Sequence, residues 1–585
     1  MGKLRHSRFV PLIIALGVVV GILIGSFCAN HFSGNRLNII NTSSNKLNVL
    51  LHLINDQYVD TVNIPDLVEK SLPQILKELD PHSTYVGAAE VEESMQELKG
   101  SFSGIGVQFT IYRDTVRVVK VIKGGPSEFS GIIAGDCIIS VDGKPFVGKE
   151  VTNDETMKRL KGPSETTVTL GIKRHGKPQT LAFSIVRGDV PLHTIDAVYM
   201  LDETTGYIRI NSFGDTTYPE FLSALAKLNG EGLEGLVIDL RGNLGGYMAP
   251  AVQIANEFLP KDRLIVYTEG RKSPREEYTS DGRGTYPTLP LVILVDEGSA
   301  SASEILAGAV QDNDRGIIVG RRTFGKGLVQ VPIDFPDGSM LRLTKARYYT
   351  PSGRCVQKPY TPGDEEEYAA DLLLRAEHGE YYSADSIKTD GEKFETRGGR
   401  VVYGGGGIIP DIFIARDTLG MTSYFMEAYR TGLMFQFAYD FVDQHRSRIG
   451  DITDLDEITT YLNRQNVVEQ FARFAEKNGL KRRNLMLQKS TKLFKEYLYN
   501  YIVGDILDTE GAIMYANLND PAVLKALSLM QNGETFPDLP ITGSPQAKAE
   551  QRTFVFGRYM ASGLTLLPHN QLLAIWQTRK HCAKF

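Results

Sequence analysis

Residues 289–330 read LPLVILVDEGSASASEILAGAVQDNDRGIIVGRRTFGKGLVQ, and this stretch decides the fold. Residues 291–295 form a short apolar, β-branched run, typical of a strand that is covered on both faces. Ile305, Leu306, Ala309 and Val310 follow at helical spacing, and residues 312–316 (DNDRG) predict the end of that helix. A second apolar run at 316–320 completes a β-α-β unit. Ser301 is therefore expected in the turn that joins a strand to a helix.

A strand-to-helix turn suits a nucleophile, because the first N–H groups of a helix are unpaired and its dipole favours a developing oxyanion. A serine hydroxyl needs a base, and residues 289–330 contain no histidine. Lys326, between two glycines, is the candidate base if burial lowers its pKa by roughly 3 units. Gln330 could orient the amine. The alternative is that Ser299, Ser301 and Ser303 only cap a helix and that Lys326 is a surface charge.

The pattern GSASASEILAGA, followed 25 residues after Ser301 (326 − 301) by FGKGLVQ, closely resembles the carboxyl-terminal processing peptidases, also called tail-specific proteases. Other motifs recur in that family's order between residues 45 and 416: DPHSTY at 80–85, DLRGN at 239–243, LTKARYYTPSGR at 343–354 and GIIPD at 407–411. The resemblance implies that Ser301 is the nucleophile, Lys326 its general base and Gln330 the residue that orients the lysine.

The same resemblance implies an oxyanion hole built from backbone amides of Gly245, Gly246 and Ala302. It also implies that acids such as Glu304 and Asp312 support the site, although from the residues alone both could be surface groups. Residues 236–240, the glycine-rich turn that follows and a helix over 248–259 repeat the strand–turn–helix device seen at Ser301. Together these features predict an α/β, crotonase-like protease core.

Short strands begin near residue 101, and the text GIGV at 104–107 and AGD…DG at 134–143 resembles a PDZ domain. In such a domain the amides of Ser103, Gly104, Ile105 and Gly106 would hold the terminal carboxylate of a peptide. The peptide would add as a strand between an edge strand and a helix, here expected at 153–160. The alternative is a small β-rich spacer.

We therefore expect a crotonase-like core with an inserted β-rich PDZ domain, an N-terminal helical segment and a C-terminal helical extension. The expected boundaries are a membrane anchor or signal at 1–29, a tether and helical segment at 30–99, the PDZ domain at 100–190, the protease core at 191–416 with a surface excursion at 358–400, and a helical extension of unknown role at 417–585.

Lys3, Arg5 and Arg8 precede an uncharged run of 19 residues, 9–27 (27 − 9 + 1), which suits a membrane span. Basic residues before a span keep the N-terminus in the cytoplasm. The sequence thus predicts a single-pass protein of a bacterial inner membrane, with its catalytic body in the periplasm. A cleaved signal that releases a soluble periplasmic protein is the alternative.

The composition of the chain bears on the remaining classes of function, namely nucleic-acid binding and metal or disulfide chemistry. The chain has 585 residues, 64 basic and 70 acidic, so its net charge of −6 gives no footprint for nucleic acid. Its four cysteines are scattered, with no CxxC pair, and its ten histidines are dispersed. Neither a zinc site nor a disulfide framework is indicated, and no metal or cofactor is predicted.

The predicted function is a serine endopeptidase that cuts proteins near apolar C-terminal tails captured by the PDZ domain, with a homo-oligomer or an adaptor protein left open. A Ser-His-Asp hydrolase is a weaker alternative, because Ser301 lacks the G-x-S-x-G elbow. His82 and His193 alone lie near family motifs, and His82 is assigned to a structural turn. A membrane-tethered, non-catalytic PDZ scaffold is disfavoured, because serine and lysine both stand at family spacing.

Overall fold

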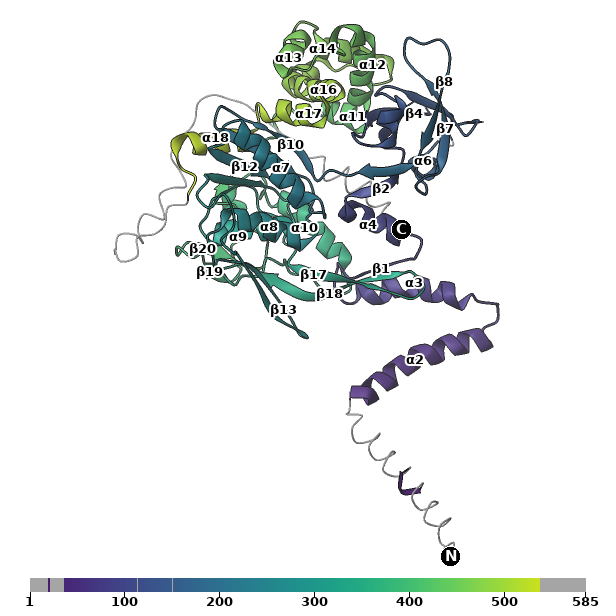
Figure 1. The fold of residues 1–585 in the computed structure, drawn as a ribbon, viewed down its shortest axis with the longest axis vertical. Helices are drawn as coiled ribbons and strands as arrows, with labels where there is room; N and C mark the ends of the chain where they lie inside the picture. Colours follow the sequence, from purple (N-terminus) through teal and green to yellow (C-terminus); the bar gives the residue numbers. More distant parts are fainter. Residues whose placement is uncertain (1–18, 22–35, 113, 150, 537–585) are drawn as a thin grey trace, which may run out of the picture. The chain divides into compact units, whose positions relative to one another are not determined.

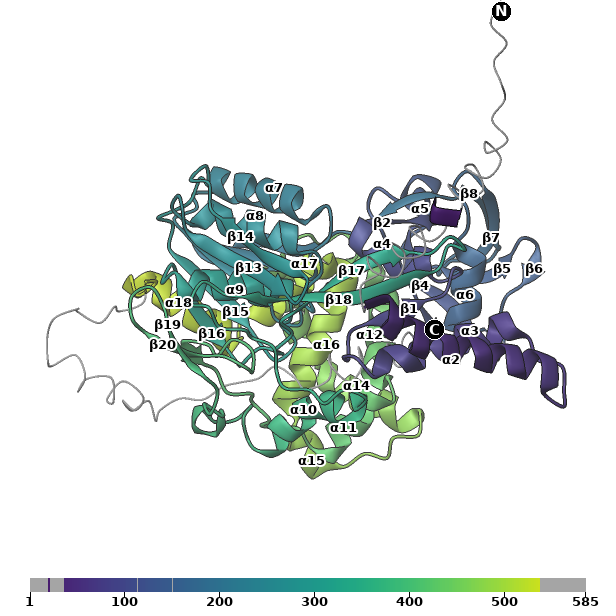
Figure 2. The ribbon, with the colours of Figure 1, turned by 90° about the horizontal axis from the view of Figure 1, so that it is seen from below.

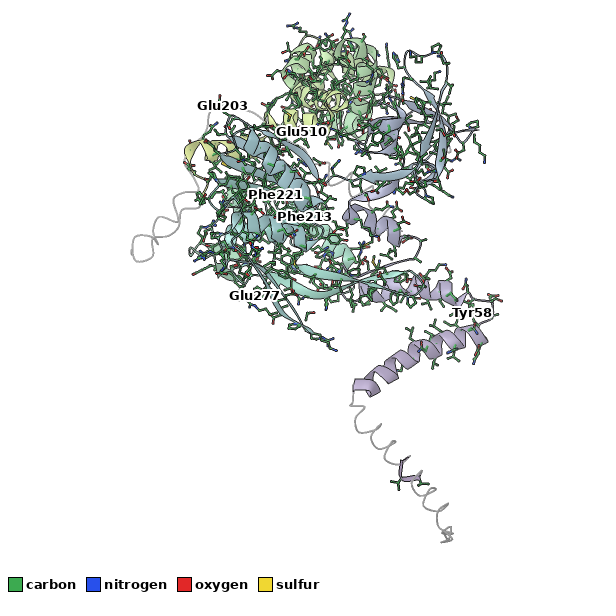
Figure 3. All side chains as sticks on the ribbon, in the orientation of Figure 1. Tyr58, Glu203, Phe213, Phe221, Glu277 and Glu510 are labelled. Atoms are coloured by element: carbon green, nitrogen blue, oxygen red, sulfur yellow. The ribbon has the colours of Figure 1, made fainter. Side chains whose placement is uncertain are left out.

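The computed structural model describes residues 19–21, 36–112, 114–149 and 151–536. The chain divides into two compact units, 1–76 and 77–585. The first contains the helix α2 (Arg36–Gln57) and nearly all of α3 (Ile64–Lys77), and Tyr58 between them is exposed (Figure 3). The membrane span predicted at 9–27 lies outside the described residues except for 19–21. Among the residues that the structure does describe, no helix is long and apolar enough to cross a membrane.

The second unit opens with β1 (Thr84–Val86) and α4 (Val91–Lys99), and its PDZ-like region follows. One sheet has the strand order β3-β4-β5-β7-β8, with β6 beside β5. The strands are β3 (Val107–Tyr112), β4 (Thr115–Val121), β5 (Cys137–Val141), β6 (Lys144–Pro145), β7 (Thr167–Lys173) and β8 (Leu181–Val186). Two helices, α5 (Pro126–Ser130) and α6 (Asn153–Leu160), accompany it, and α6 has the predicted bounds. A separate pair joins β2 (Ser101–Gly104) to β9 (Gly188–Pro191).

The catalytic region is built on a six-stranded sheet of order β10-β11-β12-β15-β16-β21. Its strands are β10 (Ile195–Met200), β11 (Thr205–Ile210), β12 (Gly235–Asp239), β15 (Leu291–Val295), β16 (Ile317–Gly320) and β21 (Ile412–Phe413). All neighbours from β11 to β21 are parallel, whereas β10 is antiparallel to β11. Every residue of β12 and β15 is buried, which confirms the buried strands predicted from their continuous apolar runs.

Helices cover both faces of this sheet (Figures 1 and 2). On one face lie α7 (Thr217–Gly230), α8 (Met248–Phe258) and α9 (Ala302–Asp312), whose core includes Phe213, Phe221 and Ile293 (Figure 3). On the other face α18 (Pro521–Asn532) packs against the alternate residues of the strands, such as Val292 and Leu294. This alternation follows from the two-residue period of a strand.

A second sheet brings distant segments of the chain together. Its strands are β1, β18 (Met340–Tyr349), β13 (Leu264–Gly270) and β14 (Ser273–Thr279), with β17 (Leu328–Asp334) paired to β18. Because β18 pairs antiparallel with both β1 and β17, the segment before β1 reaches the strand that carries Gln330.

Residues 358–400, expected to form a surface excursion, are mostly exposed or half-buried, and they contain regular elements. They form α10 (Glu365–Glu377), a 3₁₀ turn η1 (Ala384–Ser386) and β19 (Lys393–Glu395), which pairs with β20 (Val401–Tyr403). Lys358, Tyr368, Arg375 and Glu380 are buried. Its buried charges are paired: Arg375 donates to Glu380 within the segment and to the backbone carbonyls of residues 322 and 323 outside it.

The C-terminal region is helical, as the sequence predicts, over residues 417–536; the rest of the predicted extension, 537–585, lies outside the described residues. It contains α11 (Ser423–Arg430), α12 (Leu433–Ile449), α13 (Leu455–Asn463), α14 (Val467–Lys477), α15 (Asn484–Lys489), α16 (Thr491–Ile506) and α17 (Asp508–Asn517). These helices enclose an aromatic core of their own, which includes Phe425, Phe471 and Phe494. The last described helix, α18, joins the core of the six-stranded sheet, and Ile513 of α17 packs against the same cluster.

Candidate active site

Ser301 occupies the turn between β15 and α9, as the sequence predicts. Its backbone has φ 56° and ψ −113°, an unfavourable region for a residue with a side chain. Its N–H donates to the carboxylate of Glu304 at 2.9 Å. Strain of this kind persists only where the surroundings enforce it. Here the enforcing group is Glu304, a buried acid in the first turn of α9.

Glu304 ties the serine segment to the lysine segment. Its carboxylate accepts from the N–H groups of Ser301 at 2.9 Å, Gly325 at 2.8 Å and Lys326 at 2.8 Å, and from the hydroxyl of Thr323. The side chain is fully buried, and burial raises its pKa to about 6. The alternative of a surface acid is therefore wrong for Glu304, since the carboxylate fixes the two candidate catalytic backbones to each other.

Tyr348, on β18, makes a second tie between the same two segments. Its buried hydroxyl lies 2.7 Å from the carbonyl oxygen of Lys326 and 3.1 Å from that of Ser301. The tyrosine stands inside the LTKARYYTPSGR motif, whose sequence gave no indication of a role at the site. Because a hydroxyl has a single proton, the shorter contact to the Lys326 carbonyl is the stronger hydrogen bond, and the Ser301 carbonyl shares the same donor.

Lys326 is half-buried, and its surroundings shift its pKa in the direction that a base requires. Burial lowers its pKa, and the nearby positive charge of Arg342 lowers it further, whereas Glu304 and Asp80 oppose the shift. The alternative of an ordinary surface charge is therefore wrong. Among the described residues no hydrogen bond joins the Ser301 hydroxyl to the Lys326 amine. Catalytic hydrogen bonds are often long in ligand-free proteins and shorten when substrate binds.

Gln330 lies on β17, and its side chain donates from Nε2 to the hydroxyl of Thr344 at 3.2 Å. In the part of the chain that the structure describes, it makes no hydrogen bond to Lys326. The predicted contact between glutamine and lysine thus stays a prediction. The structure adds that Thr344, which the sequence analysis did not single out, holds the glutamine side chain.

His82 comes close to the site from the DPHSTY motif. Burial and the positive charge of Lys326 lower its pKa to about 3, so its imidazole is neutral. Its Nε2 lies 3.0 Å from the Tyr368 hydroxyl. The predicted structural turn is present, because Asp80 accepts from the N–H of His82 and of Ser83. The sequence analysis left these residues outside the site, since they lie about 250 positions before Lys326.

The three amides predicted for the oxyanion hole differ in availability. The N–H of Gly245 donates to Asn243 Oδ1 at 2.8 Å, whereas those of Gly246 and Ala302 have no partner among the described residues. Gly245 is needed instead for close approach: a Cβ there would lie 2.7 Å from that of Ser301. Of the three amides, those of Gly246 and Ala302 are therefore the available donors in this structure, and the oxyanion hole itself stays a prediction.

Asp312 is buried at the far end of α9, and it too is not a surface residue. It accepts from Arg354, itself fully buried, at 2.7 Å, and from the hydroxyl of Thr350. These partners belong to the TPSGR turn. No contact joins Asp312 to Ser301 or Lys326 in the described part of the chain, so its support of the site is structural.

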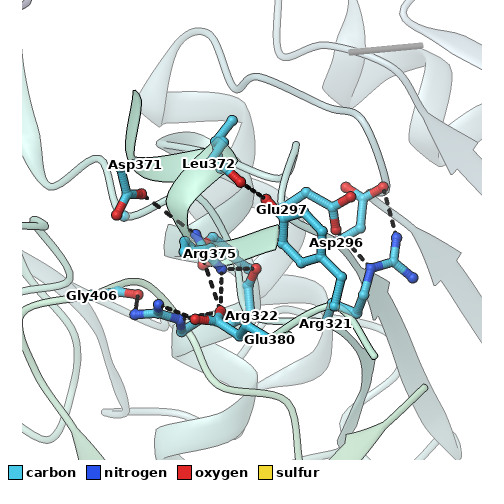
Figure 4. A network of polar contacts seen from close by, with 12 residues as sticks. Asp296, Glu297, Arg321, Arg322, Asp371, Leu372, Arg375, Glu380 and Gly406 are labelled. Atoms are coloured by element: carbon cyan, nitrogen blue, oxygen red, sulfur yellow. Dashed lines mark hydrogen bonds and ion pairs between the residues drawn. The ribbon is translucent and has the colours of Figure 1, made fainter. Parts of the chain in front are cut away.

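An ion network braces the loops on either side of Ser301 (Figure 4). Arg321 donates to Glu297, in the turn between β15 and Ser301, at 2.7 Å. Arg322 donates to Glu380, which also accepts from Arg375. The network connects α10 to the segment that leads to Lys326. The carboxylates of Glu297 and Glu380 are buried, and each is paired twice, since Glu297 also accepts from Arg416.

The loop predicted for carboxylate binding lies at the end of β2, and two of its four residues, Ser103 and Gly104, belong to that strand, which pairs with β9. Ser103 donates from its hydroxyl to the carbonyl of Gly162 at 2.7 Å, and Gly104 ends β2. The N–H groups of Ile105 and Gly106 have no partner among the described residues. They stand just before β3, which lies at the edge of its sheet. Two adjacent free amides beside an edge strand are what a peptide carboxylate needs.

A cavity of about 440 Å³ lies at the carboxyl edge of the parallel sheet, against the C-terminal helices. Arg209, Arg241, Tyr497 and Asp520 line it, but Ser301 and Lys326 do not. Within the described ranges, no cluster of three or more His, Cys, Asp or Glu side chains could hold a metal ion.

Comparisons with known proteins identify three regions of the chain. Residues 204–366 match peptidase family S41, residues 103–185 match the PDZ domain, and residues 424–508 match a family of unknown function. Among solved structures, the chain is similar to a photosystem II D1 C-terminal processing protease, with 29% identity and a TM-score of 0.31. That match covers 54% of this chain and 85% of the other.

Curated relatives match over longer stretches. A carboxy-terminal-processing protease of Bartonella bacilliformis is 36% identical over 310 residues, 52% of this chain and 70% of the relative. A probable CtpA-like serine protease of Staphylococcus haemolyticus is 30% identical over 426 residues, covering 68% and 83%. The processing protease CtpB of Bacillus subtilis is 33% identical, covering 54% and 65%. The chain therefore belongs to the carboxy-terminal-processing proteases of peptidase family S41, with a PDZ domain and a C-terminal helical region.

Proposed function

We propose that the chain is a serine endopeptidase in which Ser301 and Lys326 form the catalytic dyad and that it cuts proteins near their C-terminal tails. The observation that carries the proposal is the pair of ties from Glu304 and Tyr348, which hold the serine and lysine backbones together. The lowered pKa of Lys326 supports it, because only a neutral amine can take the serine proton.

The mechanism follows from the roles that these groups can fill. Ser301 Oγ attacks the scissile carbonyl while Lys326 Nζ takes its proton and passes it to the leaving amine. The N–H groups of Gly246 and Ala302 are the donors available to the oxyanion. A water molecule, deprotonated by the same lysine, then hydrolyses the acyl-enzyme. Gln330 orients the amine in this scheme.

Substrate selection would fall to the PDZ domain. The unpaired amides of Ile105 and Gly106 support capture of a terminal carboxylate, and the edge strand β3 supports addition of an apolar tail as a further strand. Amidating the tail removes its charge, and a hydrogen bond to a charged group contributes about 1.5–3 kcal/mol. Capture of the amidated tail should thus be on the order of 10- to 150-fold weaker.

The test compares the full-length protein with two variants on an unfolded substrate that ends in an apolar tail. Ser301→Ala should abolish cleavage. Lys326→Arg should also abolish it without unfolding the protein, because arginine remains protonated. Substantial cleavage by Lys326→Arg would overturn the dyad. Equal cleavage of free-acid and amidated substrates would overturn tail capture while leaving the dyad in place.

A non-catalytic PDZ scaffold is not favoured, because both members of the dyad are present and their backbones are tied together.

The crotonase-like character of the core stays a prediction. So does attachment to a bacterial inner membrane through residues 9–27, with the body in the periplasm. External protease should digest the body in cells with a permeabilised outer envelope while the anchor remains in the membrane. Release of an intact soluble form would favour a cleaved signal.

A further inference from the structure

We propose that Thr344 and Asp80 are positioning residues that fix which end of the Gln330 side-chain amide faces Lys326. The inference rests on the proposed dyad and deepens it. It gives the segment before β1, in the DPHSTY motif, a part in the reaction. The chain of contacts runs from Asp80 through Thr344 to Gln330, three residues brought together by the pairing of distant strands.

The three side chains are in direct contact. Gln330 and Thr344 are register partners on the antiparallel strands β17 and β18. Gln330 Nε2 lies 3.2 Å from Thr344 Oγ1, and Thr344 Oγ1 lies 3.0 Å from Asp80 Oδ1. Both lengths are ordinary hydrogen-bond distances for their atoms.

Asp80 is itself held rigidly. It accepts from the N–H groups of His82 and Ser83, each at 2.9 Å, and from the Ser83 hydroxyl at 2.6 Å. Ser83 Oγ in turn accepts from the backbone N–H of Thr344 at 3.1 Å. Asp80 and Ser83 are 6% and 5% exposed, so water competes little for these bonds. Thr344 is therefore held at its backbone and at its hydroxyl by one buried turn.

The direction of the hydrogen bonds follows from the chemistry of the groups. A carboxylate only accepts, so the single proton of the Thr344 hydroxyl goes to Asp80. The oxygen of Thr344 can then only accept from Gln330, which requires the NH₂ end of the amide. The opposite orientation would place two oxygens against each other without a proton between them. The network thus settles an amide orientation that is otherwise ambiguous.

The orientation matters to a lysine base. With NH₂ turned to Thr344, the carbonyl Oε1 of Gln330 is the end left for the amine. An oxygen there can accept an N–H of Lys326 and leave the nitrogen lone pair for the Ser301 proton. An NH₂ group there would donate into that lone pair and block the base. Asp80 also lies close enough to Lys326 for its charge to influence the amine.

The first test is Thr344→Val, which removes the hydroxyl and keeps the β-branched shape. We expect kcat to fall by about 3- to 10-fold, the range of one neutral hydrogen bond, with KM little changed. Thr344→Ser, which restores the hydroxyl, should recover most of the activity. Thr205→Val is the matched control: Thr205 is a buried threonine at the first position of β11, paired with Gly235 of β12, and kcat should not change.

The second test asks whether Thr344 acts through Gln330. Gln330→Ala should weaken turnover, and adding Thr344→Val to it should cause no further loss, because the group being positioned is already gone. Losses that multiply, or a Thr344→Val variant with wild-type kcat, would overturn the proposal. Thermal unfolding checks the fold of each variant. If Thr344→Val does not fold, Thr344→Ala removes the same hydroxyl without the second methyl group. Failure of the dyad would show separately, as activity in Lys326→Arg.

Discussion

At the residue scale, catalysis depends on how much of the Lys326 amine is neutral at the working pH. Burial lowers its pKa, and Arg342 contributes to the same shift through its positive charge. A base with a lowered pKa gives a kcat/KM that rises with pH through a group well below the ordinary lysine value of about 10.4. The effect of the Arg342 charge on the pKa of Lys326 can therefore be tested through this pH profile.

We predict that Arg342→Gln moves the acidic limb of the kcat/KM profile to higher pH. Removing a positive charge raises the pKa of Lys326, so less of the amine is neutral near pH 7, while the plateau at high pH is unchanged. Arg347→Gln, an exposed change on the same strand, is the control and should leave the profile in place. An acidic limb that stays fixed in Arg342→Gln would show that this charge does not reach the base.

Glu304 allows a second prediction at this scale. Its two oxygens serve four donors, and a glutamine would replace one oxygen with an NH₂ group that cannot accept. Each buried donor left unpaired costs about 1–3 kcal/mol. Glu304→Gln should therefore reduce kcat at least about 10-fold and lower the melting temperature. Glu257→Gln is the comparison. Glu257 is a buried acid of α8 that accepts from the Tyr218 hydroxyl and the Thr285 N–H, so its replacement should lower stability without loss of kcat.

At the scale of elements, the local units could be predicted and their long-range neighbours could not. The β15–α9–β16 unit could be predicted because the hydrophobic patterns of a strand, a helix and a second strand follow one another within about thirty residues. By contrast, Asp80 and Thr344 meet only because β1 pairs with β18 across more than 250 positions. No periodicity records such a pairing.

Other parts of the site show the same division. The Gly245-Gly246 turn was predicted from its glycines, yet the use of the Gly245 amide by Asn243 depends on side-chain direction. The acids at 304 and 312 look like surface residues in a sequence, because an acid on a short helix carries no mark of burial. Their hydrogen-bond partners lie in segments 323–326 and 350–354, which the fold alone brings together.

The helix α18 yields a prediction of its own. Its residues Ala522, Val523, Ala526 and Leu529 cover the face of the catalytic sheet that α7, α8 and α9 leave open. Ala526→Asp would place an unpaired charge against β-strands that are fully buried, a costly change. The melting temperature should fall sharply, and Leu524→Asp, on the exposed side of the same helix, should change it little. Equal melting temperatures for the two variants would show that α18 does not stabilise the sheet.

At the scale of the whole molecule, charged groups connect the PDZ domain to the C-terminal helices. Arg117 of β4 pairs with Asp443 of α12 in a buried contact, and Lys120 donates to Thr509 of α17 at 3.0 Å. Asp505 of α16 lies 3.6 Å from Arg446, but both of its carboxylate oxygens lack a hydrogen-bond partner among the residues that the structure describes. One acid in this cluster is therefore desolvated without full compensation.

The last prediction concerns that acid. Burial raises the pKa of Asp505 to about 6, against an ordinary value of about 3.9. The folded protein therefore holds this proton more tightly than the unfolded chain does, and stability falls as pH rises from about 4 to about 6. Asp505→Asn removes that loss. Above pH 7 the free energy of unfolding of the variant should exceed that of the wild type by about 3 kcal/mol, at 1.36 kcal/mol per pKa unit.

The measurement is thermal unfolding of Asp505→Asn and of the wild type between pH 4 and pH 8. The melting temperature of the variant should exceed that of the wild type by a margin that grows with pH and levels off above about 6. Asp451→Asn, an exposed aspartate just after α12, should show no such margin. A variant that is less stable than the wild type at pH 8 would mean that the attraction of Arg446 and Arg117 outweighs desolvation, so that the Asp505 charge holds the PDZ domain to the helices.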